Sequence, residues 1–165
     1  MDRSSSFESE LAALLPRLRR FAHGLSRNPA DADDLTQATI ERALRSRDQW
    51  QQGTRLDSWS YRIMRNLWID AARSMSRRAV HEAPEEDGLK VGDDPRDAMD
   101  AAVDLKRIMA AMAKLPDEQR EIVALILVEG FGYREVSEML DLPIGTVSSR
   151  LVRGRTALLA MVGEQ

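Results

Sequence analysis

The sequence predicts an all-α protein built from two small helical domains that a flexible acidic linker joins. Apolar residues recur at intervals of three and four along most of the chain, which is the spacing of amphipathic helices. Charged residues make up 31% of the 165 residues and aromatic residues only 5%, a composition that is typical of helical proteins. The segment from Arg77 to about Asp94 lacks this periodicity and holds prolines, glycines and many acids, which indicates a linker.

The stretch from Phe131 to Leu158 has the pattern of a helix-turn-helix. A short helix is predicted over 133–140, followed by a tight break over 141–143, because a helix cannot run through Pro143 without losing a hydrogen bond. A second helix is predicted to begin near Gly145 or Thr146, with a buried stripe of apolar residues at helical spacing. The small polar and basic residues of this second helix are left facing outward: Thr146, Ser148, Ser149, Arg150 and Arg153.

Such a helix suits the major groove of DNA, which is about 12 Å wide and admits one α-helix. Short Ser and Thr side chains let the helix approach the base edges, while Arg150 and Arg153 reach guanines or phosphates. One bidentate arginine–guanine pair contributes about 1–3 kcal/mol of discrimination between bases. The alternative interpretation is an ordinary helical hairpin with a solvated basic face.

The N-terminal part of the chain predicts two further helices. The first has one apolar face from Phe7 to Leu25, and Pro16 either kinks this helix or begins it. The second starts with Asn28 as N-cap and Pro29 as the first helical residue, and it runs to about Arg47. A solvated face is an adequate explanation for the polar residues on its outside, which are Asp33, Asp34, Gln37, Glu41 and Arg42.

A third helix, predicted over 57–74, has two distinct faces at 100° per residue. The face predicted to be buried carries Tyr61, Met64, Trp68, Ala71 and Ala72. The opposite face spans about 80° and carries Trp59, Arg62, Asn66, Asp70 and Arg73. An aromatic ring, an amide and arginines on one stripe can stack on an unpaired base and bind its edge. A surface stripe held by contacts between residues four apart explains the same pattern.

Helices are also predicted in the C-terminal part, before the helix-turn-helix. One begins with Asp94 and Pro95 as N-cap and first helical residue. Another restarts after Leu115 and Pro116 and stops at Gly130.

Composition excludes several function classes. The chain has no cysteine, so disulfides and thiolate metal sites are excluded, and this fits a cytoplasmic protein. It has no apolar run of about 18 residues and no secretory signal, so no membrane insertion is expected. Its two histidines, His23 and His81, lie far apart and have no Asp, Glu or His cluster at ligand spacing, so we expect no metal, no cofactor and no catalytic residues.

Four segments in the same order resemble the extracytoplasmic-function (ECF) sigma factors of the sigma-70 family, over nearly the whole chain. The first two, DADDLTQATIERAL and LDSWSYRIMRNLWIDAARS, are similar to D-D-L-x-Q-E-x-x-x-R-A and W-L-Y-R-I-A-x-N-x-x-I-D-x-x-R. The third, LPDEQREIVAL, is similar to L-P-x-x-x-R-E-V-x-x-L. The last, YREVSEMLDLPIGTVSSRLVRGRTAL, is similar to Y-x-E-I-A-E-I-L-G-x-P-x-G-T-V-x-S-R-L-x-R-A-R.

The resemblance implies sigma region 2 over residues 1–78, a linker over 79–94 and sigma region 4 over 95–165. Its expected role is to direct RNA polymerase core to specific promoters, in a stress or environmental response, and to help melt the −10 element. The residues expected to face the polymerase clamp helices are Asp33, Asp34, Leu35, Gln37 and Glu41. The stripe with Trp59, Arg62, Asn66, Asp70 and Arg73 is expected to bind the −10 strand. The outward residues from Thr146 to Arg153 are expected to bind the −35 element.

The resemblance also implies partners besides promoter DNA and the clamp helices and flap of the polymerase. Sigma factors of this size are usually held by an anti-sigma factor, so a monomer or a 1:1 complex is expected. The chain departs from the family pattern at four positions, where it has Ala38, Leu44, Asp141 and Ser148 in place of Glu, an aromatic residue, Gly and Lys. Promoter preference therefore cannot be copied from relatives.

Three other interpretations compete with a sigma factor. A sigma-like decoy would bind an anti-sigma factor but no promoter, although such mimics usually carry an extra regulatory domain. A stand-alone helix-turn-helix regulator would not need the stripe on the third helix. An enzyme is the weakest alternative because no candidate general base or metal site is present.

Overall fold

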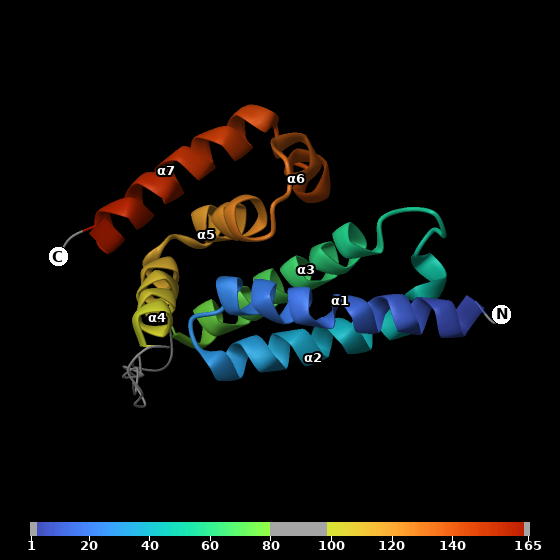
Figure 1. Cartoon of the computed structure of the whole chain (residues 1–165). Coiled ribbons are helices and arrows are strands. Elements are labelled where there is room, and N and C mark those ends of the chain that lie inside the picture. Colours follow the sequence, from blue (N-terminus) through green and yellow to red (C-terminus); the bar gives the residue numbers. More distant parts are fainter. Residues whose placement is uncertain (1–2, 80–98, 164–165) are drawn as a thin grey trace.

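The computed structural model describes residues 3–79 and 99–163, and the elements of these residues are helical, which confirms the predicted all-α class (Figure 1). The N-terminal half (residues 3–79) contains α1 (Arg3–Leu25), α2 (Pro29–Arg45), the 3-10 turn η1 (Arg47–Gln49) and α3 (Leu56–Ala79). The C-terminal half (residues 99–163) contains α4 (Met99–Lys114), α5 (Asp117–Val123), the π-helical segment η2 (Ala124–Val128), α6 (Tyr133–Leu140) and α7 (Ile144–Gly163).

The helix boundaries of the N-terminal half follow local signals in the sequence. Asn28 is the N-cap of α2, and its side chain accepts a hydrogen bond from the N–H of Asp31 at 2.8 Å, as predicted. Pro16 lies inside α1, so this helix begins well before the proline. The second helix ends at Arg45, slightly earlier than predicted, because the chain tightens into the 3-10 turn after Ser46.

Two residues with positive φ define the turns of the C-terminal half. Gly130 has φ +77°, which confirms the predicted stop after the helix that begins behind Pro116. Asp141 ends α6 with φ 54° and ψ 51°, a left-handed conformation that aspartate tolerates better than most residues. The helix α7 begins at Ile144, just before the predicted start. The predicted N-cap at Asp94 lies outside the described residues, as does the predicted linker after Ala79.

The two halves pack on each other through one continuous apolar core. In Figure 1, α5 and α6 lie over α1 and α3, while α2 lies on the far side of those helices. At the junction, the ring of Tyr61 on α3 packs edge-on against Phe21 of α1 at 4.7 Å and against Phe131 of the C-terminal half at 5.3 Å. Tyr61 is 1% exposed, so its ring belongs to both halves of the core.

A buried arginine also joins the halves. Arg120 of α5 is 1% exposed, and its guanidinium donates to the carbonyl of Leu25 at 2.9 Å, at the C-terminus of α1. It also donates to the carbonyls of Met112 at 2.9 Å and Leu115 at 2.7 Å, at the end of α4. The last carbonyls of a helix have no partner within the helix. Arg120 therefore satisfies the ends of two helices at once.

Gly154 allows α7 to pack closely against α5 within the C-terminal half. Gly154 of α7 is buried against α5, and a Cβ added there would lie 2.8 Å from Cγ2 of Val123 and 3.3 Å from Cβ of Gln119. Real Cβ atoms essentially never approach another atom as closely as 2.8 Å. The helix α7 can therefore approach α5 this closely because residue 154 has no side chain.

We expect Gly154→Val to destabilise the fold by about 2 kcal/mol, because the added side chain forces α7 away from α5. Urea unfolding followed by circular dichroism measures this change. Gly145→Val is the control, since a Cβ added to Gly145 meets no atom within 4 Å. Equal stabilities of the two variants would contradict this account of the α5–α7 contact.

Candidate nucleic-acid interface

The exposed stripe of α3 is a polar surface that runs along the middle turns of this helix, from Arg62 to Arg73. Arg62, Asn66, Asp70 and Arg73 are all exposed and follow one another at intervals of about one turn. A surface pocket of about 240 Å³ lies at the end of this stripe and is lined by Asp70, Arg73, Ser74 and Arg77. The stripe therefore combines cationic, amide and carboxylate groups beside a hollow that is open to solvent.

Trp59 is set apart from the rest of the stripe. Its indole is half-buried and packs edge-on against Phe7 of α1, with ring centroids 6.1 Å apart. The sequence placed Trp59 with Arg62 and Asn66 on one face, and the structure turns its ring toward the first helix. Trp59 therefore anchors the start of α3 to α1.

The opposite face of α3 is buried only in its first turns. Tyr61 and Met64 are in the core, as predicted, whereas Trp68 and Ala72 are half-buried. The prediction that Ala71 is buried is wrong. Ala72 is half-buried, and the exposed side chains described after it are those of Arg73, Ser74, Met75 and Arg77.

The polar face of α2 is open. Asp33, Asp34, Gln37 and Glu41 are exposed there, and Asp33 lies 3.8 Å from both Arg19 and His23 of α1. Leu35 is only 9% exposed and packs into the core, so its side chain is not part of this open face.

The helix-turn-helix has the geometry that the sequence predicts. Between α6 and α7, the hydroxyl of Ser137 donates to the carbonyl of Leu142 at 2.5 Å, and the N–H of Leu142 donates to the carbonyl of Ser137 at 3.0 Å. The carbonyl of Pro143 then accepts from the N–H of Thr146 at 3.0 Å, in the first turn of α7. These bonds close the end of α6 and the start of α7 around the three-residue turn 141–143.

Four of the five residues predicted to read DNA share one face of α7. Thr146, Ser149, Arg150 and Arg153 fall within roughly 100° of each other, opposite the buried Val147 and Leu151. Ser148 lies roughly 150° from the middle of that face and is half-buried.

The two arginines of this face differ in their surroundings. Arg153 is exposed. Arg150 is 25% exposed, and its Nη2 lies 3.3 Å from Oε2 of Glu118 in α5. Glu118 thus holds Arg150 against the fold, while Arg153 projects to solvent.

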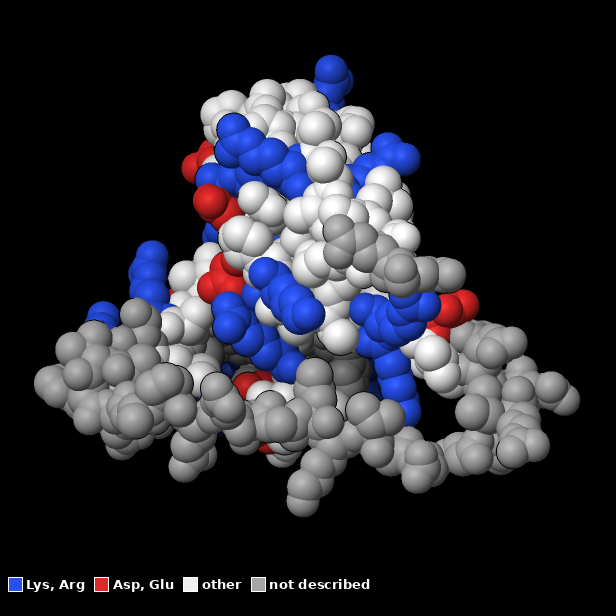
Figure 2. All heavy atoms as spheres, turned by 90° about the vertical axis from the view of Figure 1, so that its left-hand side faces the viewer, with Lys and Arg blue, Asp and Glu red and all other residues white. Residues whose placement is uncertain are grey.

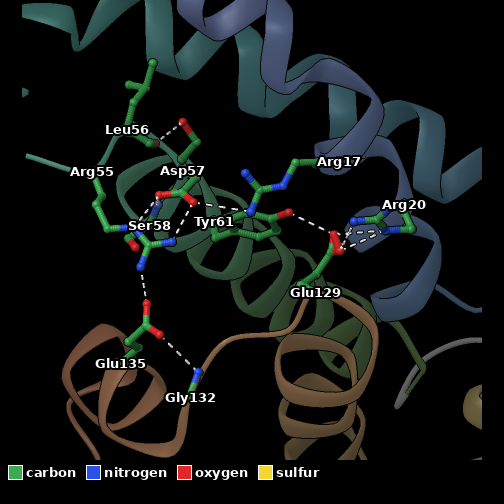
Figure 3. Close-up of polar contacts among 11 residues, drawn as sticks. Arg17, Arg20, Arg55, Leu56, Asp57, Ser58, Tyr61, Glu129, Gly132 and Glu135 are labelled. Carbon is green, nitrogen blue, oxygen red and sulfur yellow. Dashed lines mark hydrogen bonds and ion pairs between the residues drawn. The ribbon is translucent and has the colours of Figure 1, made fainter.

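The ion pairs between the two halves all have the same polarity. In the described part of the chain, four ion pairs join the halves, and each has its arginine in the N-terminal half and its acid in the C-terminal half. The pairs are Arg20–Glu129, Arg27–Asp117, Arg55–Glu135 and Arg65–Glu121. Figure 3 shows two of them, around Glu129 and Glu135.

Glu129 is the most enclosed acid of this set, with a side chain that is 0% exposed. Its carboxylate accepts from Arg20 Nε at 2.8 Å, from Arg20 Nη2 at 2.6 Å and from the Tyr61 hydroxyl at 2.8 Å (Figure 3). Burial and the hydrogen bond to Glu129 raise the pKa of Tyr61, so this hydroxyl is a permanent donor at physiological pH.

Two other carboxyls in or beside this interface have shifted pKa values. Burial raises the pKa of Glu121, although its hydrogen bond to Arg65 acts in the opposite direction. Burial also acts to raise the pKa of Asp57, but hydrogen bonds from Arg55 and from the N–H of Ser58 outweigh it, so the pKa falls below its usual range. Asp57 is therefore ionised at neutral pH and holds the start of α3 to Arg55.

Sequence reasoning missed the residues that join the halves. Arg65 and Glu121 are 56 positions apart, and Arg20 and Glu129 are 109 apart, so no local pattern connects them. The only signal in the sequence is the basic stretch from Arg55 to Arg78, which contains six arginines and two acids.

Lys and Arg side chains also spread over the end of the molecule that Figure 2 shows, with fewer acids among them. The C-terminal ends of α3 and α7 and the helix α4 all lie at this end (Figure 1). Among the described residues, no group of three His, Cys, Asp or Glu side chains could hold a metal ion. No helix formed by the described residues is long and apolar enough to span a bilayer.

Comparison with known proteins relates both halves to one family. Residues 11–78 match Sigma-70 region 2, and residues 105–158 match Sigma-70, region 4. The ECF RNA polymerase sigma factor EcfG of Rhodopseudomonas palustris is 35% identical over 162 residues, which cover 98% of this chain and 88% of that relative. The ECF RNA polymerase sigma factor SigE of Mycolicibacterium smegmatis is 37% identical over 145 residues, which cover 86% of this chain and 56% of that relative.

A solved structure has the same arrangement over almost its full length. It is the sigma factor RpoE in complex with the anti-sigma factor NepR from Bartonella quintana, with a TM-score of 0.80 and 31% identity. The match covers 96% of this chain and 97% of that chain.

Proposed function

The chain belongs to the ECF sigma factors of the sigma-70 family, and we propose that it directs RNA polymerase core to specific promoters at transcription initiation. The observation that carries this proposal is the joint presence of region 2 over residues 11–78 and region 4 over residues 105–158 in one chain. A stand-alone helix-turn-helix regulator has no use for the first of these regions. The polymerase forms the phosphodiester bond, so we assign no catalytic step to this chain, and its place of action is the cytoplasm.

Region 2 is proposed to occupy residues 1–78 and region 4 residues 95–165, with a linker over 79–94 between them. The exposed acids and amide of α2, which are Asp33, Asp34, Gln37 and Glu41, support a docking face for the polymerase clamp helices. Leu35 has its side chain in the core, so its proposed role is to hold α2, which carries this face, in place. An anti-sigma factor is a further proposed partner, since the similar sigma factor from Bartonella quintana was solved with one.

At the −10 element, we assign capture of unstacked bases to Arg62, Asn66, Asp70 and Arg73. An amide can bind the edge of an extruded base, and the arginines can stack on bases or bind phosphates. The pocket beside Asp70 and Arg73 offers a hollow next to these groups. Capturing bases outside the duplex offsets the cost of unstacking them, so the melted state is stabilised.

At the −35 element, the exposed face of α7 supports docking in the major groove. Thr146 and Ser149 are short enough to let the helix approach base edges, and Arg153 can reach a guanine or a phosphate. Ser148 was also predicted to bind DNA, but its half-buried position roughly 150° from the middle of this face gives that contact the least support of the five.

The decisive test is in vitro transcription of fragmented source-genome DNA by core polymerase, with and without this chain, followed by mapping of the 5′ ends. We expect new ends that share a two-part motif upstream, because two separate regions read the promoter. No new ends, together with no binding to core in gel filtration, would instead favour a decoy or a stand-alone regulator.

We expect Asn66→Ala to impair promoter opening more than closed-complex binding, because its amide acts only on the unpaired strand. Permanganate footprinting at a promoter found by end mapping measures the melting. Met75→Ala is the control, since Met75 is 62% exposed on the other side of α3. Normal melting with the Asn66 variant would remove this residue from the −10 site.

We expect Arg153→Ala to weaken −35 binding by about 1–3 kcal/mol if it reads a guanine, with relaxed selectivity at one base pair. If it contacts a phosphate, binding falls uniformly and the salt slope drops by about 1. Competition binding of the holoenzyme to promoter variants separates the two cases.

Arg155→Ala is the matched control, because Arg155 is exposed on the same helix roughly 180° from Thr146. Arg150→Ala should weaken binding as well, and it also frees Glu118 from its ion pair. Unchanged binding and selectivity in both the Arg150 and Arg153 variants would contradict the assignment of the recognition face.

A further inference from the structure

One acid of α5 lies at the edge of the α7 face that we assign to the −35 element. Oε2 of Glu118 is 3.3 Å from Nη2 of Arg150, an arginine whose side chain is only 25% exposed. The two residues are far apart in the sequence and meet because α5 and α7 pack on each other (Figure 1). Glu118 is therefore a neighbour of the recognition helix that the pattern of the helix itself does not predict.

The packing of α7 on α5 places Arg150 at the border of the recognition face. Gly154 lies one turn after Arg150, and its missing side chain lets α7 approach Val123 of α5. At 100° per residue, Arg150 lies roughly 40° from Gly154, whereas Arg153 lies roughly 100° from it. Arg150 is thus the arginine of this face that lies next to α5, where Glu118 is in the first turn.

The two neighbouring acids of α5 have other partners. Glu121 binds Arg65 at 3.0 Å, and Asp117 lies 3.0 Å from Nη1 of Arg120. The dipole of α5 favours an acid in its first turn, and this effect alone explains a glutamate at position 118. It does not explain why the carboxylate contacts a side chain of another helix, so the contact calls for a reason of its own.

An ion pair of this kind affects geometry more than stability. Glu118 has a side chain that is 60% exposed, and water screens the attraction in such a pair. A mobile arginine loses rotamer freedom when it binds a base, and a guanidinium that is already oriented loses less. The carboxylate engages only Nη2 of Arg150, so Nη1 and Nε keep their donors for DNA.

We propose that Glu118 is a positioning residue for promoter recognition, which holds Arg150 so that this arginine reads one base pair of the −35 element. The positioning role rests on the proposed docking of α7 in the major groove. The base pair is one with a guanine, whose O6 and N7 accept two hydrogen bonds from one guanidinium. Arg153 is exposed and lies farther from α5, which makes it the comparison within the same face.

The same carboxylate has a second effect on DNA that acts in the opposite direction. The charge of Glu118 repels the phosphates of any duplex, whatever its sequence. If repulsion is its only effect, removing the charge raises the affinity for all sequences equally. If Glu118 positions Arg150, removing the charge lowers discrimination at one base pair without lowering the affinity for unrelated DNA. One set of binding measurements separates the two effects.

The experiment measures competition binding of the full chain with core polymerase to mapped promoters in which each −35 base pair is changed in turn. We expect Glu118→Gln to reduce discrimination at one G·C pair by about fivefold, the lower end of what an arginine–guanine pair contributes. Affinity for an unrelated duplex should stay equal or rise. Glu118→Asp keeps the charge but is shorter by one methylene group, so it should lower the same discrimination without that rise. Asp104→Asn removes an exposed carboxylate of α4 and should change neither quantity.

A double-mutant cycle identifies the arginine on which Glu118 acts. In the Arg150→Ala chain, Glu118→Gln should cause no further loss of discrimination, because the side chain that it positions is gone. In the Arg153→Ala chain, the same change should still reduce discrimination by about fivefold. A merely structural role would instead lower the urea midpoint and weaken binding to every sequence in both backgrounds.

The possible outcomes separate this role from the sigma function. The positioning role is overturned if Glu118→Gln leaves discrimination unchanged, if it weakens binding to every sequence equally, or if Arg150→Ala itself leaves discrimination unchanged. Each of these results leaves the sigma function standing as long as the wild-type holoenzyme discriminates between −35 base pairs. A wild-type holoenzyme that binds core but shows no such discrimination overturns the −35 role of α7 and, with it, the role of Glu118.

Discussion

The closed structure depends on one buried cation. Arg120 is almost completely enclosed, and it donates to carbonyls at the ends of α1 and α4, including Leu25 and Met112. Burial lowers the pKa of Arg120 and its neighbour Asp117 opposes that shift, yet an arginine remains charged at any physiological pH. A carbonyl left buried without a donor costs about 1–3 kcal/mol, so the ends of both helices are fixed by this one side chain.

Arginine side chains other than Arg120 also hold the two halves together. Arginines of the N-terminal half bind acids of the C-terminal half, and further arginines lie on the stripe of α3 that we propose binds a nucleic acid. Apolar packing between Tyr61 of the N-terminal half and Phe131 of the C-terminal half adds a contact that does not depend on charge. Separating the halves would expose buried groups of both, among them Tyr61, Arg120 and Glu129.

The departures from the family pattern lie at different places in this structure. Ala38 and Leu44 are half-buried on α2, so they alter the surroundings of the polymerase face and not its exposed acids. Asp141 replaces a glycine and still adopts the left-handed conformation that the turn requires. Ser148 is half-buried and lies roughly 150° from the middle of the proposed recognition face, so the missing lysine concerns the side of α7 away from that face.

The sequence by itself determined the local structure and the family. Amphipathic spacing, the Asn28 cap and the prolines and glycines of the turns placed the helices to within a few residues, because each signal acts within one or two turns. Four motifs in order identified the family. Only the tertiary structure decided that Trp59 turns to Phe7, that Ala71 is exposed and that Arg62 is held by α6. Helical spacing fixes the side of a helix on which a residue lies, but the partner on that side comes from distant parts of the chain, as Arg20 and Glu129 do.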